Sequence, residues 1–183
     1  MAVAAVSVVA APRGAGSTVR LPRTLRHLLA TRFAARRRFP PALLNDIEST
    51  TREAEAQHAG EIRFAVESAL DLPHLWRGTT PRARALQVFS QLGVWDTAAN
   101  NGVLVYVLLA DKVVEIVADR GIAARVAQDE WDRICREMEQ HYAAARFREG
   151  SLAGIRRIGG LLARHFPGAA AGPDALPDRP VLM

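Results

Sequence analysis

The sequence predicts an α/β domain in which helices sandwich a small mixed β-sheet. Three patterns lead to this prediction: an alternating segment at 61–70, a continuously apolar segment at 103–110, and apolar stripes with helical spacing after residue 128. The chain has 183 residues, the size of one domain. Its 49% hydrophobic and 23% charged residues are ordinary for a globular protein, which excludes collagen-like, coiled-coil and wholly disordered chains.

The first half of the domain is predicted as helix, strand, loop and helix. A helix is expected over 41–58, because proline suits a first turn and apolar residues then follow a 3.6-residue period. Residues 61–70 alternate between apolar and polar side chains, as in a half-buried strand. Residues 71–79 form a loop. Thr80 is a typical N-cap for a helix over 81–92.

The second half is predicted as a hairpin followed by two helices. The apolar segment 103–110 is expected to be a central strand covered on both faces. A tight turn at 111–112 leads to its hairpin partner at 113–118. Apolar stripes at helical spacing then predict helices over 129–142 and 149–166, the two C-terminal helices of the fold.

This order of elements gathers polar loops at one edge of the sheet. The first two strands flank a helix and are therefore parallel, with a right-handed crossover, whereas the second and third strands are antiparallel. The second strand thus begins where the third ends. We expect Asp96, Asn100 and Asn101 to lie there beside Asp119 and Arg120.

These loop residues have two possible roles. Carboxylate and carbonyl oxygens are the ligands that Ca²⁺ and Mg²⁺ prefer, so Asp96, Asn101 and Asp119 are candidate metal ligands. Arg120 and Asn100 are candidate contacts for an anion or a partner. Asp and Asn also form turns next to strands, and no motif fixes a ligand set here. Both interpretations stay open.

Basic residues are unevenly distributed along the chain. Of 24 lysines and arginines, eight arginines lie in residues 1–38, which contain no acidic residue. The net charge is +5, but the remaining chain has 16 basic against 19 acidic residues. A weakly acidic body does not favour specific binding of nucleic acid, which depends on neutralising phosphates.

The basic N-terminal segment also contains apolar residues at helical spacing: Leu25, Leu28, Leu29 and Phe33. Residues 20–38 are therefore suited to lie on an anionic membrane surface. An organellar transit peptide and a solvated basic arm are the alternatives. No segment is apolar over the ~20 residues that a transmembrane helix needs. We expect a cytoplasmic protein, with peripheral membrane attachment as the open alternative.

Common catalytic signatures are missing. The sequence contains no GxSxG, GxxxxGK[ST], HExxH or GxGxxG motif. Cys135 lies on an apolar helical stripe and is expected to be a small core residue. His58 precedes the first predicted strand and is a candidate to approach the polar edge, but a histidine in this position is more often a helix-end residue that favours the C-terminal dipole.

Residues 92–122 resemble the core of the TPM domain family, which includes bacterial membrane-associated proteins and plant thylakoid lumen proteins. The segment NNGVL at 100–104 matches the family pattern directly, and Asp-Lys at 111–112 stands at its DR turn. LGVW at 92–95 stands roughly at its WGIG position. In element order the resemblance covers about residues 40–167, and the chain is similar to a divergent bacterial member.

The chain departs from the family pattern at two places. The glycine-rich GYGLEG loop is replaced by ADRGI at 118–122, and the motif before the first helix is absent or replaced by RRRFPP at 36–41. The resemblance implies an α/β sandwich and divalent-metal binding in the loops at one sheet edge. For a plant lumen member it implies acid phosphatase activity and a role in photosystem repair.

We therefore predict a basic N-terminal arm at 1–38, flexible or amphipathic, a TPM-like domain at 39–167, and a disordered Pro/Gly/Ala tail at 168–183. The predicted function is a non-catalytic accessory or interaction domain with an unknown protein partner. The alternative is a metal-dependent phosphatase acting on phosphomonoesters. In that alternative Asp96 and Asp119 hold the metal and Arg120 holds the phosphate. Whether the chain is an enzyme stays open.

Overall fold

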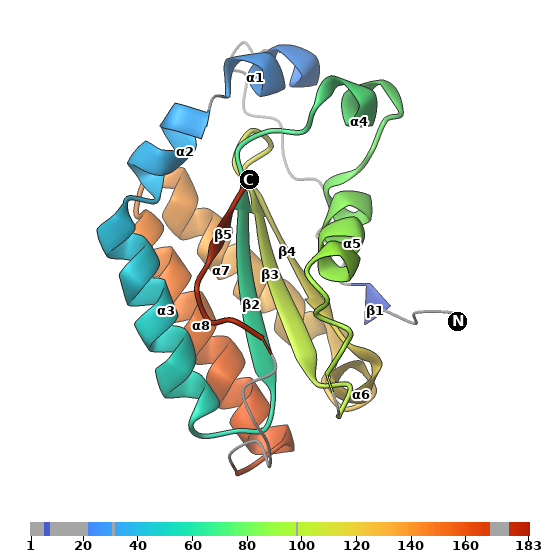
Figure 1. Ribbon diagram of the computed structural model, residues 1–183, viewed down its shortest axis with the longest axis vertical. Coiled ribbons are helices and arrows are strands. Elements are labelled where there is room, and N and C mark those ends of the chain that lie inside the picture. Colours follow the sequence, from blue (N-terminus) through green and yellow to red (C-terminus); the bar gives the residue numbers. More distant parts are fainter. Residues whose placement is uncertain (1–5, 8–21, 31, 98, 169–175) are drawn as a thin grey trace.

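The computed structural model describes residues 6–7, 22–30, 32–97, 99–168 and 176–183. Over this part of the chain, a five-stranded mixed sheet lies between helices, in the strand order β1-β4-β3-β2-β5 (Figure 1). The predicted fold class, including the two C-terminal helices, is confirmed.

The strands pair as the order of elements predicts. They are β1 (Val6–Ser7), β2 (Glu61–Glu67), β3 (Gly102–Leu108), β4 (Val113–Ala118) and β5 (Val181–Leu182). β2 and β3 are parallel, because the helix between them returns the chain to the start of the sheet, and Phe64 lies opposite Val105. β3 and β4 form the antiparallel hairpin, in which Val105 lies opposite Ile116.

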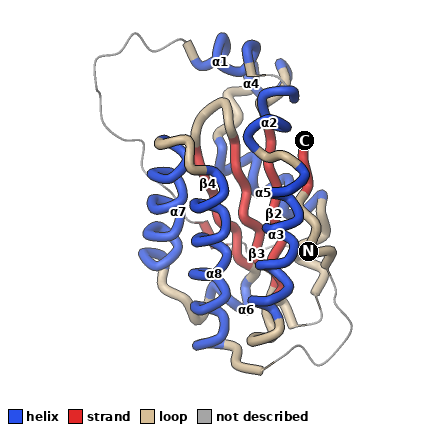
Figure 2. The backbone as a smooth tube through the Cα atoms, turned by 90° about the vertical axis from the view of Figure 1, so that its left-hand side faces the viewer, coloured by secondary structure: helices blue, strands red, loops and turns tan. Residues whose placement is uncertain are grey.

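Helices cover the sheet unequally. They are α1 (Arg23–Leu29), α2 (Arg32–Arg38), α3 (Pro41–Glu55), α4 (Leu72–Trp76), α5 (Pro81–Gln91), α6 (Arg120–Ala123), α7 (Gln128–Ala143) and α8 (Phe147–His165). α3, α7 and α8 pack on one face, and α5 covers the other (Figures 1 and 2). β3 contributes alternate residues to both apolar clusters and is fully buried, as expected of a central strand.

A buried polar network lies under α5. The Nε and Nη2 atoms of Arg84 donate to the two carboxylate oxygens of Glu67, each at 2.9 Å. The Tyr106 hydroxyl donates to the same carboxylate. Burial and the neighbouring Glu67 carboxylate raise the pKa of Tyr106. The network links β2, β3 and α5 and satisfies a carboxylate that would otherwise be costly to bury.

The described residues of the N-terminal arm form β1, which pairs with β4, and the helices α1 and α2. α1 rests on the domain. Three α1 side chains surround the Asp111 carboxylate: the Arg23 and Arg26 guanidinium groups at 2.8 and 3.3 Å, and the His27 Nε2 atom at 3.1 Å. The backbone N–H of Leu70 donates to His27 Nδ1 at 2.9 Å. Burial of Asp111 opposes its ionisation, but hydrogen bonds from Arg23 and His27 outweigh that cost and lower its pKa. None of the helices described is both long and apolar enough to cross a bilayer.

The prediction of a disordered tail at 168–183 is wrong for residues 176–183. These residues end in β5, which extends the sheet beside β2: the Met183 N–H donates to Val66 O at 2.8 Å. The Arg63 guanidinium binds the carbonyl oxygens of Pro177 and Arg179. Residues 169–175 lie outside the described part of the chain.

The docked C-terminal segment also changes the burial of β2. We expected a half-buried strand, but all seven residues of β2 are buried. Its polar side chains are satisfied rather than solvated: Arg63 by the C-terminal carbonyls and Glu67 by Arg84. The expectation was wrong because alternation in one strand does not show what other segments place on its polar face.

A pair of carboxyl groups joins α3 to the C-terminal segment. Glu55 accepts a hydrogen bond from the Ile62 N–H at 2.6 Å, and Asp178 is buried next to it, 3.1 Å from the Arg52 guanidinium. Burial, together with the nearby Asp178 carboxylate, raises the pKa of Glu55 to about 9. Glu55 therefore keeps its proton to a higher pH than a solvent-exposed glutamate does.

This pair predicts a loss of stability at alkaline pH. Folding raises the Glu55 pKa above its ordinary value of 4.5. The contribution of Glu55 to the free energy of unfolding is therefore complete below pH 4.5 and disappears as the pH rises towards 9. We expect the free energy of unfolding to fall by about 2 kcal/mol or more between pH 5 and 9. Glu55→Gln should remove most of this dependence, whereas Glu53→Gln, on the exposed side of α3, should keep it. Urea unfolding at several pH values tests this, and parallel profiles for Glu55→Gln and the wild type would contradict it.

Candidate functional site

Two loops meet where β3 begins and β4 ends. We call residues 96–97, 99–101 and 119–121 the loop edge. The Asp119 N–H donates to Gly102 O at 2.8 Å, which continues the hairpin pairing, and the Gly121 N–H donates to Asn100 O at 3.1 Å. The predicted convergence of these loops is therefore present, close to α6 (Figure 1).

Two glycines allow this close approach. A Cβ atom on Gly102 would lie 2.0 Å from Val94 O, and one on Gly121 would lie 2.5 Å from Asn100 O. Both distances are far below van der Waals contact, and both neighbours are backbone atoms. The glycines that follow Asn101 and Arg120 are thus required for the loops to pack against each other.

Asn101 is buried at the entrance to β3. Its backbone N–H donates to Thr97 Oγ1 at 3.0 Å, and its side-chain Nδ2 donates to Ala59 O. The amide oxygen Oδ1 is buried and accepts no hydrogen bond from the described residues. The orientation of the side chain is therefore fixed through its nitrogen, and its oxygen is left available for another partner.

Asp119 has a similar arrangement at the end of β4. Its Oδ1 atom accepts from the Arg120 N–H at 2.6 Å, as the N-cap of α6. Its Oδ2 atom is buried and has no hydrogen-bond partner in the described part of the chain. A buried polar atom without a partner costs about 1–3 kcal/mol. Each of the two contacting loops thus contains one buried oxygen without a hydrogen-bond donor among the described residues.

The remaining predicted residues lie at the surface of the loop edge. Asp96 is exposed and lies in a turn, where its backbone N–H donates to Gly93 O at 2.9 Å. Arg120 is exposed, and its Nε donates to Asn100 Oδ1 at 3.0 Å. The described residues contain no group of three or more His, Cys, Asp or Glu side chains arranged for a metal. A cation at the loop edge would therefore need the Asn101 amide oxygen, main-chain carbonyls or water as additional ligands.

Other residues that shape the loop edge were harder to find from the sequence. Thr97 and the carbonyl of Ala59 orient Asn101, but nothing in the sequence pattern marks them. His58 lies beside Ala59, is fully buried, and accepts from the Gly60 N–H through Nδ1 at 3.2 Å. Burial lowers the pKa of His58, and its Nε2 atom has no hydrogen-bond partner among the described residues. His58 thus precedes the residue whose carbonyl orients Asn101.

Family membership follows from the sequence of the whole domain. The model of the TPM domain family matches residues 37–161, which include the complete loop edge. The chain belongs to the TPM domain family. The matched residues leave out α1 and β5, so both elements lie outside the region that defines this TPM domain.

A solved structure supports the fold of this TPM domain. The chain is similar to the BA42 protein from the psychrophilic bacterium Bizionia argentinensis, determined by NMR, with 30% sequence identity and a TM-score of 0.66. The similarity covers 78% of this chain and 93% of that protein. No protein with a curated description matches the chain significantly.

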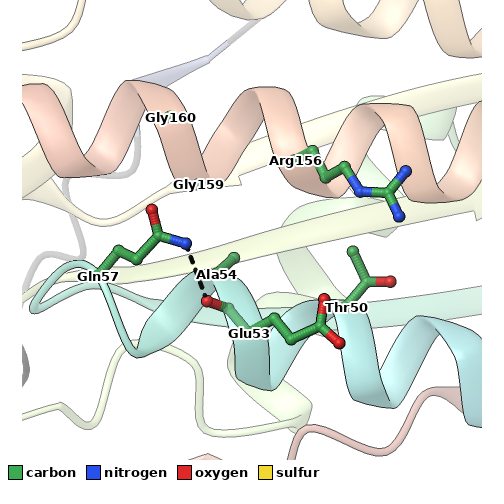
Figure 3. A pocket seen from close by; sticks show the side chains of 7 residues that line it. All are labelled: Thr50, Glu53, Ala54, Gln57, Arg156, Gly159 and Gly160. Carbon is green, nitrogen blue, oxygen red and sulfur yellow. Dashed lines mark hydrogen bonds between the residues drawn. The ribbon is translucent and has the colours of Figure 1, made fainter.

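The TPM domain also has a groove on its side, away from the predicted residues. The groove, of about 240 Å³, lies between α3 and α8 (Figure 3). Its lining consists of Thr50, Glu53, Ala54, Gln57, Arg156, Gly159 and Gly160. The helices approach closely here, because a Cβ atom on Gly159 would lie 2.8 Å from the Ala54 Cβ. With one carboxylate and one guanidinium group, the groove offers less specific chemistry than the loop edge.

Proposed function

We propose that this TPM domain is a non-catalytic accessory domain that binds Ca²⁺ or Mg²⁺ at the loop edge and serves a protein partner. The observation that carries the proposal is the pair of buried oxygens without hydrogen-bond donors, Asn101 Oδ1 and Asp119 Oδ2. Both are hard oxygen ligands, the type that these cations prefer. A cation would relieve the cost of burying them without a partner.

The composition of the loop edge indicates modest affinity. Asp119 is its one buried carboxylate, and exposed Asp96 is available as a second only if its turn approaches the cation. A calcium site with few charged ligands has a dissociation constant of about 10⁻⁴–10⁻³ M. Such a site is expected to stabilise the two loops and thereby the surface that a partner recognises.

The phosphatase alternative receives less support from the geometry. The Nε of Arg120, the candidate phosphate ligand, is engaged by Asn100 in an exposed position. Cys135 is buried in α7, and burial raises the pKa of its thiol, which disfavours the thiolate needed of a nucleophile. The alternative nevertheless predicts a simple result: hydrolysis of p-nitrophenyl phosphate that depends on the metal and is lost in Asp119→Asn.

A metal titration of the full chain tests the accessory proposal. With a dissociation constant of about 1 mM, 10 mM Ca²⁺ should stabilise the fold by about 1.4 kcal/mol. That corresponds to a rise in melting temperature of about 3–5 °C. We expect Asp119→Asn to abolish the rise and Asp96→Asn to reduce it if that turn contributes a ligand.

Asp129→Asn is the matched control, because it removes one exposed carboxylate at the start of α7 that pairs with Arg133 and is not among the predicted ligands. It should keep the full rise in melting temperature. Urea unfolding without metal shows whether Asp119→Asn still folds. An unchanged melting temperature in 10 mM Ca²⁺ and Mg²⁺, or a rise that persists in a folded Asp119→Asn variant, would contradict the proposal.

A further inference from the structure

Exposed apolar side chains are concentrated at the end of the molecule opposite the loop edge. Of the seven strongly exposed large apolar side chains in the described residues, six lie in α1, α2 and α4. α1 and α4 lie together at this end in both views, whereas α6 marks the other end (Figures 1 and 2). We call the exposed residues of these two helices the apical patch: Leu25, Leu28, Leu29, Leu72 and Trp76.

The apolar side of α1 faces away from the domain. Leu25, Leu28 and Leu29 have i, i+3 and i+4 spacing and share one side of the helix. His27 and Arg23 lie on the opposite side, where they contact Asp111. Since those contacts hold the polar side of α1 against the sheet, the leucines are presented outward; Leu29 is 61% exposed.

α4 continues the same surface. The N–H of Leu70, just before α4, donates to His27 of α1 at 2.9 Å. The Arg23 guanidinium donates to the carbonyl of Thr79, just after α4, also at 2.9 Å. α1 is therefore fastened to both ends of the segment that carries α4. Trp76 is 80% exposed on this segment, the largest exposed fraction among the large apolar side chains described.

The charge around the patch is predominantly positive. Residues 22–39 contain six arginines and no acidic residue. Of the carboxylates nearby, Asp111 is already paired with Arg23 and Arg26, and Asp71 is paired with His74. Outward leucines and a tryptophan, surrounded by arginines, are typical of helices that lie in the interface of an anionic bilayer. A second copy of the chain is a less suitable occupant, because docking would bring two such basic segments together.

We propose that the apical patch docks on an anionic lipid surface, with the leucines and Trp76 inserted at the level of the headgroups and the exposed Arg36 and Arg37 of α2 facing lipid phosphates. Each arginine near such a surface contributes about 1 kcal/mol. The proposal does not rest on cation binding, because the loop edge lies at the far end of the sheet and faces away from the lipid.

Vesicle sedimentation of the full chain tests this directly. We expect binding to vesicles of phosphatidylglycerol and phosphatidylcholine, weakening as salt is added, and little binding to phosphatidylcholine alone. Trp76→Ala should weaken binding about fivefold or more, and Leu28→Asp with Leu29→Asp should abolish it. Trp95→Ala is the matched control, since Trp95 is 45% exposed but lies next to the start of β3, and it should bind like the wild type.

Quenching of tryptophan fluorescence by brominated lipid separates insertion from simple electrostatic adsorption. The wild type and Trp95→Phe should be quenched, and Trp76→Phe should lose most of the quenching. The proposal is overturned if the chain does not bind anionic vesicles, if it binds neutral vesicles equally well, or if Trp76→Ala binds like the wild type. Dimerisation that the leucine substitutions abolish, without vesicle binding, would assign the patch to a second copy instead.

Discussion

Replacing Gly102 by alanine should lower the free energy of unfolding by about 3 kcal/mol or more. The new Cβ atom would lie 2.0 Å from Val94 O and 2.9 Å from Val94 Cγ1. Gly102 cannot shift to relieve this contact, because β2 pairs with it on one side and the Asp119 N–H binds its carbonyl on the other. The strain would therefore spread to the loop edge as well as to the sheet.

Gly160→Ala provides the comparison. This glycine lies in α8 with no atom within 4 Å of the added Cβ position. Alanine should be neutral there or stabilise the helix by about 0.5–1 kcal/mol, since it has the higher helix propensity. Urea unfolding of both variants decides the matter. A Gly102→Ala variant within 1 kcal/mol of the wild type would show that the Val94 turn can move, so that close packing does not determine the geometry of the loop edge.

Arg84→Met should destabilise the domain by about 3–5 kcal/mol, the usual cost of leaving one partner of a buried ion pair alone. The Glu67 carboxylate would lose all of its hydrogen bonds to the guanidinium group while remaining buried between the sheet and α5. Only the Tyr106 hydroxyl would still donate to it. Methionine keeps much of the volume, so the loss reports mainly on the uncompensated charge.

Two further variants make this prediction specific. Arg133→Met removes an exposed arginine paired with Asp129 and should cost less than about 0.5 kcal/mol. Adding Glu67→Gln to Arg84→Met should recover part of the stability, because the buried charge is removed while a hydrogen-bond acceptor for Tyr106 remains. Urea unfolding measures the free energy of unfolding of each variant. If the losses caused by Arg84→Met and Glu67→Gln simply add in the double variant, the network of Arg84, Glu67 and Tyr106 is contradicted.

The sequence predicts those parts of the fold that depend on local patterns. The apolar run of β3 and the order of elements around it determine a parallel pair and a hairpin, as observed. Thr80 caps α5 as predicted, accepting the Ala83 N–H at 3.1 Å. The segment at 71–79 was expected to be a loop but contains α4, a helix of one turn that Asp71 caps.

Elements fixed by distant contacts could not be predicted. β5 has two residues, too few for any periodicity to be visible, and its position depends on Arg63 and on the edge of β2. Likewise, the exposure of the α1 leucines follows from an ion-pair cluster around Asp111, which is far away in the sequence. Periodicity predicts an amphipathic helix but not which of its sides meets the domain.

The candidate site was predictable in position but not in detail. Strand order alone places Asn101 beside Asp119, because one residue precedes β3 and the other follows β4. Which oxygens lack partners depends on Thr97, on Ala59 O and on the cap of α6, and these contacts are visible only in three dimensions.

The most direct test of the central claim is an NMR titration of the full ¹⁵N-labelled chain with Ca²⁺. Binding at the loop edge predicts saturable shifts of the backbone amides at 100–102 and 119–121, while amides of the apical patch stay unchanged. Absence of shifts up to 10 mM Ca²⁺, well above the expected dissociation constant of about 1 mM or less, would contradict cation binding at the loop edge. So would saturable shifts confined to another part of the molecule.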